Sequence, residues 1–258
     1  MTTAPQSVEL PVFYKGVMAL NSRDHASWHR RTTDKASWLA NQHVVPLTVE
    51  EFPQAQRHFP VIFSSGRDPI PLALMGMNEG VNVFVDSAGA LPDSFYVPAY
   101  ARRYPFILAK LTPEASELSL CFDPSSNLVG DFAEGEALFD GVTPTDACKA
   151  ALYFCEQFEA AGQKTTAFIA ELIQHDLLME GEVAIQQDGA ERPFVYRGFQ
   201  MVNQAKLRDL PGDVLTNWNQ TGVLSMIFAH LHSLELTRDI FLRQVRLGEA
   251  SAEVPALA

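Results

Sequence analysis

The sequence is poor in cysteine and has no long hydrophobic run. Its 258 residues include three cysteines, Cys121, Cys148 and Cys155, and no CxxC pair. An odd and sparse set of this kind predicts neither a disulfide framework nor a zinc site, and it favours buried thiols that pack as small apolar groups. Nowhere do eighteen apolar residues follow one another, so the sequence predicts no membrane insertion.

Positive charge is also scarce. The chain has 19 Lys and Arg residues against 31 Asp and Glu residues, a formal charge of −12, and no Lys/Arg-rich run offsets it. Because such a chain repels phosphates and anionic lipid headgroups, we expect no nucleic-acid partner and no membrane-surface binding. The N-terminal segment lacks the basic and apolar regions of a signal peptide, so we expect a cytoplasmic protein.

The familiar catalytic motifs are missing as well. There is no Gly-rich phosphate loop after a strand, no GxSxG and no HExxH. His25 and His29 are four residues apart and could share a metal ion if they lay on a helix, but no second ligand cluster accompanies them. The sequence therefore predicts no metal and no cofactor. It leaves open whether the protein is an enzyme, and the missing motifs favour a non-enzymatic role.

Short runs of strand-forming residues occupy the first half of the chain. Residues 12–20, 43–52, 59–65 and 118–124 have the composition of strands bounded by turns. Residues 70–77 and 81–87 flank Asn78, Glu79 and Gly80, which favours a hairpin. We expect a mostly antiparallel sheet in this part of the chain.

Helical periodicity takes over in the second half. Thr143 and Pro144 have the order of an N-cap and a first helical residue, and Gly162 is expected to end that helix before a second one begins. Residues 178–198 return to strand character, with a turn at 187–189. Helices are expected at 213–219 and from 223 to about 247, broken at Gly222.

These patterns predict an α+β protein with a mostly antiparallel, β-rich N-terminal half. The C-terminal half would be helical and carry a small hairpin. We expect a β-rich lobe at 10–140 and a helical lobe at 141–248, joined in one compact unit, with flexible termini at 1–9 and 249–258.

The segment from Tyr96 to Lys110, YVPAYARRYPFILAK, gathers aromatic and basic residues. Tyr96, Tyr100 and Tyr104 are four residues apart and would share one face of a helix. Pro98 is suited to open that helix, and Tyr104 should close it because it precedes a proline. Residues 106–109 then favour a buried strand.

The arginines of this segment, Arg102 and Arg103, cannot both point into a core. At least one should be accessible or paired with a carboxylate such as Asp86 or Asp93. Two interpretations stay open. The tyrosines and one guanidinium could tie loops together, or an arginine could hold a carboxylate of a ligand or partner.

The same segment resembles the signature of the bacterial SapC family, a PAY-RRYPF block. Other pieces of the sequence agree with that family over roughly residues 10–236. They are Phe13-Tyr14-Lys15, Val45-Pro46-Leu47, Glu51-Phe52-Pro53, Pro60–Phe63, Asn82–Asp86, Leu138-Phe139-Asp140, Gly198-Phe199, Lys206-Leu207 and Ala229–Leu234.

The resemblance implies an accessory role. SapC-like proteins are similar to products encoded beside TonB-dependent receptors, flavin-dependent halogenase-like proteins and cupin or JmjC-type oxygenases. It therefore implies a cytoplasmic accessory or binding protein for uptake or for modification of a peptide or small molecule, with a protein partner such as these neighbours. The family name also points to a surface-layer-associated component, which is a further alternative. The resemblance carries no catalytic residues.

The candidate site for a partner or a small acidic ligand combines this segment with two residues from elsewhere. It consists of Tyr96, Tyr100, Arg102, Arg103, Tyr104, Asp86 and His230. As an enzyme, the protein would combine an arginine that holds an acidic substrate, Tyr100 or His230 to move a proton, and Asp86. His230 could instead have a structural role, as a hydrogen-bonded histidine at the edge of the core.

Overall fold

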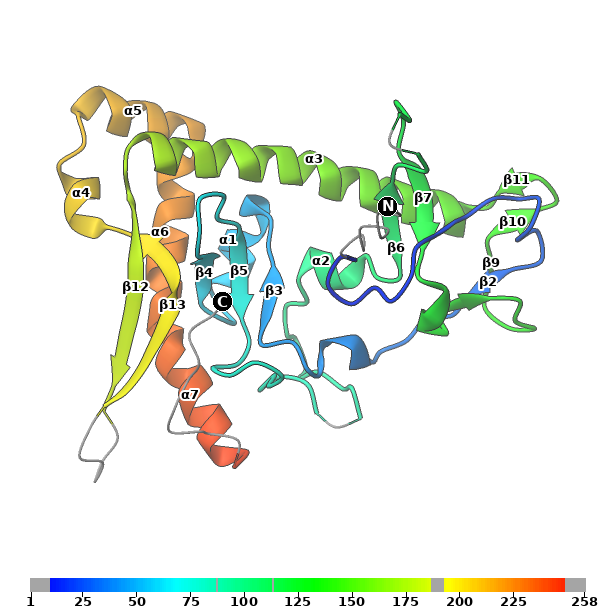
Figure 1. Cartoon of the computed structure of the whole chain (residues 1–258), viewed down its shortest axis with the longest axis horizontal. Helices are drawn as coiled ribbons and strands as arrows, with labels where there is room; N and C mark the ends of the chain where they lie inside the picture. The colour runs from blue at the N-terminus through cyan, green and yellow to red at the C-terminus, as the bar shows by residue number, and fades with distance from the viewer. Residues whose placement is uncertain (1–9, 87, 113, 187–192, 249–258) are drawn as a thin grey trace, which may run out of the picture. The chain divides into compact units, whose positions relative to one another are not determined.

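The computed structural model describes residues 10–86, 88–112, 114–186 and 193–248 (Figure 1). The predicted flexible termini and the predicted turn at 187–189 lie outside these residues. The chain divides into two compact units. Unit 1 joins the residues up to Asp34 to Arg103–Gln157, and unit 2 joins Lys35–Arg102 to the residues from Phe158 onward. The units interleave along the chain, whereas the predicted lobes 10–140 and 141–248 are consecutive. That the two lobes are joined in one compact unit stays a prediction.

Unit 1 is built on small antiparallel sheets. One has the strand order β1-β7-β6 and another the order β8-β2-β9, while β10 pairs with β11. Their bounds are β1 Met18–Ala19, β2 His29–Arg30, β6 Phe106–Ala109, β7 Ser119–Phe122, β8 Val129–Gly130, β9 Glu136–Ala137, β10 Phe139–Asp140 and β11 Thr143–Pro144, with the short helix η3 at Pro124–Ser126.

The core of unit 1 includes the thiols. Cys148 and Cys155 pack in one apolar cluster with Phe106 and Phe122, and Cys121 packs in a second cluster with Tyr14. All three cysteines are free and buried, as predicted for Cys148 and Cys155. Burial raises the pKa of Cys121 and Cys148, so these thiols stay protonated and are poor nucleophiles.

Unit 2 is built on a five-stranded antiparallel sheet of order β12-β13-β4-β5-β3. The strands are β3 Val44–Pro46, β4 Val61–Ser64, β5 Pro71–Leu74, β12 Leu178–Ile185 and β13 Phe194–Val202. The short helices are η1 Ser37–Leu39, η2 Val49–Glu51, α1 Phe52–Ala55, α2 Ala99–Arg102, α4 Gln204–Arg208 and η4 Leu234–Leu236, and the longer ones are α5 Gly212–Thr221, α6 Val223–Ser233 and α7 Thr237–Arg246.

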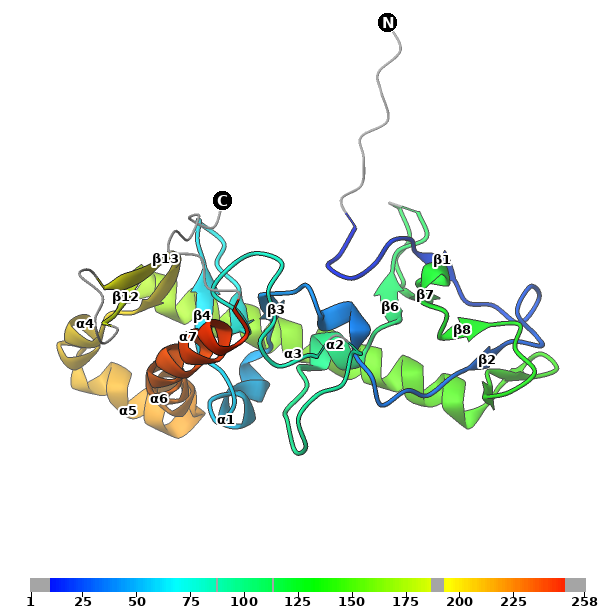
Figure 2. The same ribbon diagram turned by 90° about the horizontal axis from the view of Figure 1, so that it is seen from below.

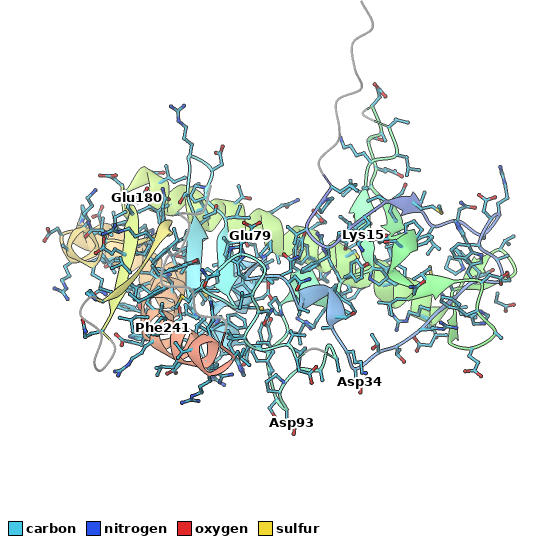
Figure 3. All side chains as sticks on the ribbon, turned by 60° about the horizontal axis from the view of Figure 1, so that its bottom comes forward. Lys15, Asp34, Glu79, Asp93, Glu180 and Phe241 are labelled. Atoms are coloured by element: carbon cyan, nitrogen blue, oxygen red, sulfur yellow. The ribbon has the colours of Figure 1, made fainter. Side chains whose placement is uncertain are left out.

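Helices from the end of the chain cover this sheet. Helix α6 contacts β4, β13 and α1 (Figures 1 and 2). Phe241 of α7 places its ring 4.6 Å from that of Phe194 on β13 (Figure 3). The predicted hairpin around 178–198 thus joins strands from the first half of the chain in one sheet. The α+β class with antiparallel sheets is confirmed, and no described helix is long and apolar enough to cross a membrane.

The predicted hairpin of 70–77 with 81–87 is wrong in its second strand. Strand β5 is present, but β4 and β3 already occupy its two edges. Described residues 81–86 contain no strand. Instead the Asn82 amide donates hydrogen bonds to the carbonyls of Leu39 and Gln42, at 3.0 and 3.1 Å, and its own Oδ1 accepts from the Phe84 N–H.

The predicted end of a helix at Gly162 is also wrong. Helix α3 runs without a break from Asp146 to Gln174. Its first turn is capped by Thr145, whose hydroxyl accepts from the Cys148 N–H, whereas Thr143 lies in β11. A glycine inside a helix costs only about 1 kcal/mol relative to alanine, which packing over so long a helix easily offsets. Gly222 does end α5 as predicted, with a φ of 82°.

Alanine at the two glycines should therefore have opposite effects. No other group lies within 4 Å of a Cβ added at either residue, so only the backbone differs. We expect Gly162→Ala to raise the free energy of unfolding by about 0.5–1 kcal/mol, because it favours the helix. Gly222→Ala should lower it by about 1–2 kcal/mol, because its φ is positive. Denaturant unfolding of both variants checks this, and a loss of stability in Gly162→Ala would contradict a continuous α3.

Candidate functional site

The segment from Tyr96 onward forms a short helix between two prolines. Helix α2 covers Ala99–Arg102, and the Pro98 carbonyl accepts hydrogen bonds from the N–H groups of Ala101 and Arg102. The chain then passes through a cis peptide bond at Tyr104–Pro105 into β6. The predicted strand at 106–109 is confirmed. The predicted helix is present but shorter than expected: of the three tyrosines only Tyr100 lies in it, so the predicted shared face of Tyr96, Tyr100 and Tyr104 is wrong. The boundary between the two compact units falls between Arg102 and Arg103.

In unit 2, a buried carboxyl group fixes the start of this segment. Glu51 is 6% exposed and ends η2. Its Oε2 accepts hydrogen bonds from the N–H and the hydroxyl of Thr48, at 2.7 and 3.0 Å. Its Oε1 accepts from the Tyr96 hydroxyl at 2.9 Å and from the Ala99 N–H at 2.6 Å. Glu51 thereby ties the entry of α2 to η2.

In unit 1, a second buried carboxyl group fixes the end of the segment. Asp123 is fully buried. Its Oδ2 accepts from the Lys15 N–H at 2.8 Å and from the Tyr104 hydroxyl at 3.2 Å. Its Oδ1 accepts from the N–H and the hydroxyl of Ser125, at 2.8 and 2.7 Å. The Tyr104 ring also contacts the ring of Tyr14, whose hydroxyl donates to the Phe106 carbonyl.

These contacts shift the acidity of the groups involved. Burial and the negative charge of Glu51 raise the pKa of Tyr96 to about 12, although the positive charge of Arg102 opposes the shift. Burial and Asp123 likewise raise the pKa of Tyr104. Burial pushes the pKa of Asp123 upward, but its hydrogen bonds outweigh that effect and lower it. Both tyrosines therefore stay protonated and act as hydrogen-bond donors.

One arginine of the pair is exposed and the other is buried, as expected. Arg102 is exposed, and its guanidinium carbon lies 5.7 Å from the centre of the Tyr96 ring, a cation–π geometry. Arg103 is 6% exposed. Tyr100 is also buried, with its ring 6.0 Å from that of Phe158. Arg102 is therefore the arginine that a partner can reach.

The Tyr96 ring that Arg102 faces has further aromatic neighbours, and a second arginine lies near one of them. His58 lies 6.3 Å from Tyr96 in a stacked arrangement and 5.6 Å from Phe95, measured between ring centres. Burial, together with the positive charge of Arg57, lowers the pKa of His58, so this ring is neutral at pH 7. We call the surface formed by Arg57, His58, Phe95, Tyr96 and Arg102 the Arg102 patch.

A family model matches most of the chain, including all the residues of this patch. The SapC model matches residues 20–240. The chain belongs to the SapC family. No curated protein and no solved structure matches the chain.

Within the described part of the chain, neither of the aspartates predicted to pair with an arginine does so. Asp86 is exposed and closes its own turn, because its Oδ1 accepts hydrogen bonds from the N–H groups of Ala88 and Ala90, each at 2.8 Å. Asp93 lies at the outer end of its loop, with its side chain directed away from the ribbon (Figure 3). Among the described residues, neither aspartate forms a hydrogen bond or an ion pair with an arginine.

His230 lies in the core of the SapC fold. It is completely buried on α6, its Nε2 accepts from the Val202 N–H at 3.1 Å, and its Nδ1 lies 2.7 Å from the Val61 carbonyl. The proton must therefore sit on Nδ1. Burial lowers the pKa of His230 to about 4, although the Val61 carbonyl opposes the shift. This placement favours the structural interpretation of His230.

The described residues contain no group of three or more His, Cys, Asp or Glu side chains arranged to hold a metal ion. His25 is buried in a turn and packs 4.4 Å from the Trp28 ring, while His29 lies in β2, so the two do not share a helix.

Sequence reasoning missed Glu51, Asp123 and His58. For Glu51 a signal existed, because Thr48 and Glu51 have the spacing of a capping box, and η2 carries one. Asp123 precedes Pro124 and Ser125, and its Oδ1 caps η3. This local sequence pattern predicts a capping role for Asp123, but it does not predict the hydrogen bond to Tyr104. Nothing in the sequence indicates that His58 packs on Tyr96.

Removing the Tyr96 hydroxyl should measurably weaken the fold. Tyr96→Phe keeps the ring under Arg102 but removes one donor from the buried Glu51 carboxyl group, so we expect a loss of about 1 kcal/mol in the free energy of unfolding. Tyr153→Phe is a matched control, because Tyr153 is exposed on α3. Chemical denaturation measures both, and equal stabilities would show that the bond to Glu51 contributes nothing.

His230 should make stability depend on pH. Between pH 6.5 and about 4 the unfolded chain binds a proton at this histidine and the native protein does not. Stability should therefore fall as the pH falls through this window, by up to about 3 kcal/mol in total. His230→Gln should show a flatter dependence, although it starts from lower stability. Parallel slopes for the two proteins in urea titrations would contradict the neutral, buried state of His230.

Proposed function

We propose that this SapC-family protein is a non-enzymatic accessory protein that binds a partner protein through the Arg102 patch. The partner would present an acidic group, and the setting would be TonB-dependent uptake or modification of a peptide or small molecule. One observation carries the proposal. Arg102 is held exposed over a tyrosine ring whose hydroxyl is bonded to a buried carboxyl group.

The composition of the patch supports binding to a protein. Tyrosine and arginine are the residue types that most often dominate binding energy at protein interfaces. Arg57 and Arg102 place positive charge on a chain of net charge −12, so an acidic partner would be attracted to this surface and repelled by most of the rest. Because Glu51 already holds Tyr96, little side-chain freedom is lost when a partner binds.

The enzyme alternative receives less support. It would use Asp86, Tyr100 and His230 with an arginine, yet each of these has a local role. Asp86 closes a turn, Tyr100 is buried against Phe158, and His230 has both ring nitrogens engaged by the backbone. A proton-transfer group must reach the substrate, so these placements favour binding over catalysis.

Replacing the two arginines separately should distinguish a binding role from a structural one. We expect Arg102→Ala to lower affinity for the partner at least tenfold with little change in stability, because the side chain is exposed. Arg103→Ala should instead lower stability, because this side chain is buried. The measurement is co-purification, followed by titration, with the TonB-dependent receptor, halogenase-like and oxygenase-like products of neighbouring genes.

Arg67→Ala is the matched control. Arg67 is exposed, also lies in unit 2 and carries the same charge, so its loss should leave affinity unchanged. The proposal fails if none of the neighbouring products forms a stable complex. It also fails if Arg102→Ala binds as tightly as Arg67→Ala.

A further inference from the structure

Unit 2 contains a cavity that is separate from the Arg102 patch. Its volume is about 470 Å³, within the range of about 300–1,000 Å³ typical of sites for small organic molecules. It lies among η2, the second half of α3 and the junction of α5 with α6. The lining is mainly apolar and consists of Val49, Glu50, Lys164, Ala167, Phe168, Glu171, Asn217, Trp218, Thr221, Gly222, Val223 and Met226.

One carboxylate in this wall is held in a fixed orientation. Glu171 Oε2 accepts a hydrogen bond from the indole Nε1–H of Trp218 at 3.0 Å, and Trp218 is only 1% exposed. His175 lies 4.0 Å from the same oxygen and packs edge-on against the indole. The other oxygen, Oε1, has no hydrogen-bond donor among the described residues. The indole therefore positions Glu171 and leaves Oε1 for a ligand.

The charges around the cavity favour a positively charged ligand. Glu50 and Lys164 form an ion pair at 2.5 Å and largely neutralise each other. Glu171 has no lysine or arginine partner within the described part of the chain. The N-terminus of α6 at Val223 carries a partial positive charge of roughly half a unit, which offsets part of the negative charge of Glu171. The balance is still negative, in a chain whose overall charge is negative too.

We propose that this cavity binds an organic ammonium ion with an aromatic or branched aliphatic body. The apolar body would lie against Phe168, Val223 and Met226, and the ammonium group would donate a hydrogen bond to Glu171 Oε1. Such charge-assisted bonds are about twice as strong as neutral ones. The inference does not depend on the proposed accessory function, because it uses none of the Arg102 patch.

The test uses phenethylammonium as the probe, with the full-length protein. Binding is followed by tryptophan fluorescence and by calorimetry. The Trp218→Phe variant shows which part of the fluorescence change comes from Trp218. We expect saturable binding of phenethylammonium that exceeds that of 2-phenylethanol, which has the same body without the charge, and that of ethylammonium, which lacks the body. A phenylalanine-containing peptide amide in a parallel titration distinguishes a peptide source of the ammonium group from a free amine.

Glu171→Gln is the decisive variant. Glutamine keeps an acceptor for the Trp218 indole but removes the charge, so affinity for phenethylammonium should fall about tenfold or more. Glu156→Gln removes the same charge from an exposed position of α3 and should bind normally. The proposal is overturned if Glu171→Gln binds as well as Glu156→Gln, if 2-phenylethanol binds equally well, or if no probe binds. Preference for phenylacetate would assign the cavity to an anion at the start of α6 instead.

Discussion

Two buried carboxyl groups determine how the SapC signature segment is held. A buried carboxylate is unfavourable unless hydrogen-bond donors surround it. Glu51 and Asp123 meet this requirement in the same way, each with a neighbouring hydroxyl and backbone N–H and with one tyrosine of the segment. Because Glu51 also binds the Ala99 N–H and Asp123 also binds the Lys15 N–H, the two ends of the segment are each anchored within their own unit. The tyrosines thus serve as anchors, and their raised pKa values are a consequence of that role.

The exposed positive charge follows from this anchoring. Because the Tyr96 hydroxyl is directed to Glu51, its ring is left to face the Arg102 guanidinium and to stack with His58. Burial keeps His58 neutral at pH 7, so the ring adds apolar surface without repelling the arginines. A rigid aromatic base beneath an exposed cation is suited to hold a carboxylate of another molecule, and it does not require a proton-transfer group nearby.

Local patterns in the sequence were sufficient for the elements but not for their partners. The strands at 61–64, 106–109 and 119–122 and the helix stop at Gly222 follow from short-range composition and turn chemistry. Around Asn82 and Phe84 the alternation of burial is real, yet no strand forms, because β4 and β3 already occupy both edges of β5. The same limit applies to the candidate site. Its tyrosines and arginines were visible in one segment, whereas Glu51 lies 45 residues from Tyr96 and only the folded chain brings them together.

The short helix η2 serves two surfaces with consecutive residues. Glu50 lines the cavity and pairs with Lys164, whereas the next residue, Glu51, faces Tyr96 and Ala99. Four hydrogen bonds immobilise Glu51, and the Val49 N–H is bonded to Thr165 on α3. A ligand in the cavity would thus contact an element that cannot move without breaking several buried bonds. Since conformational coupling requires an element with two accessible arrangements, we expect η2 to keep the proposed binding in the cavity independent of the proposed binding at the Arg102 patch.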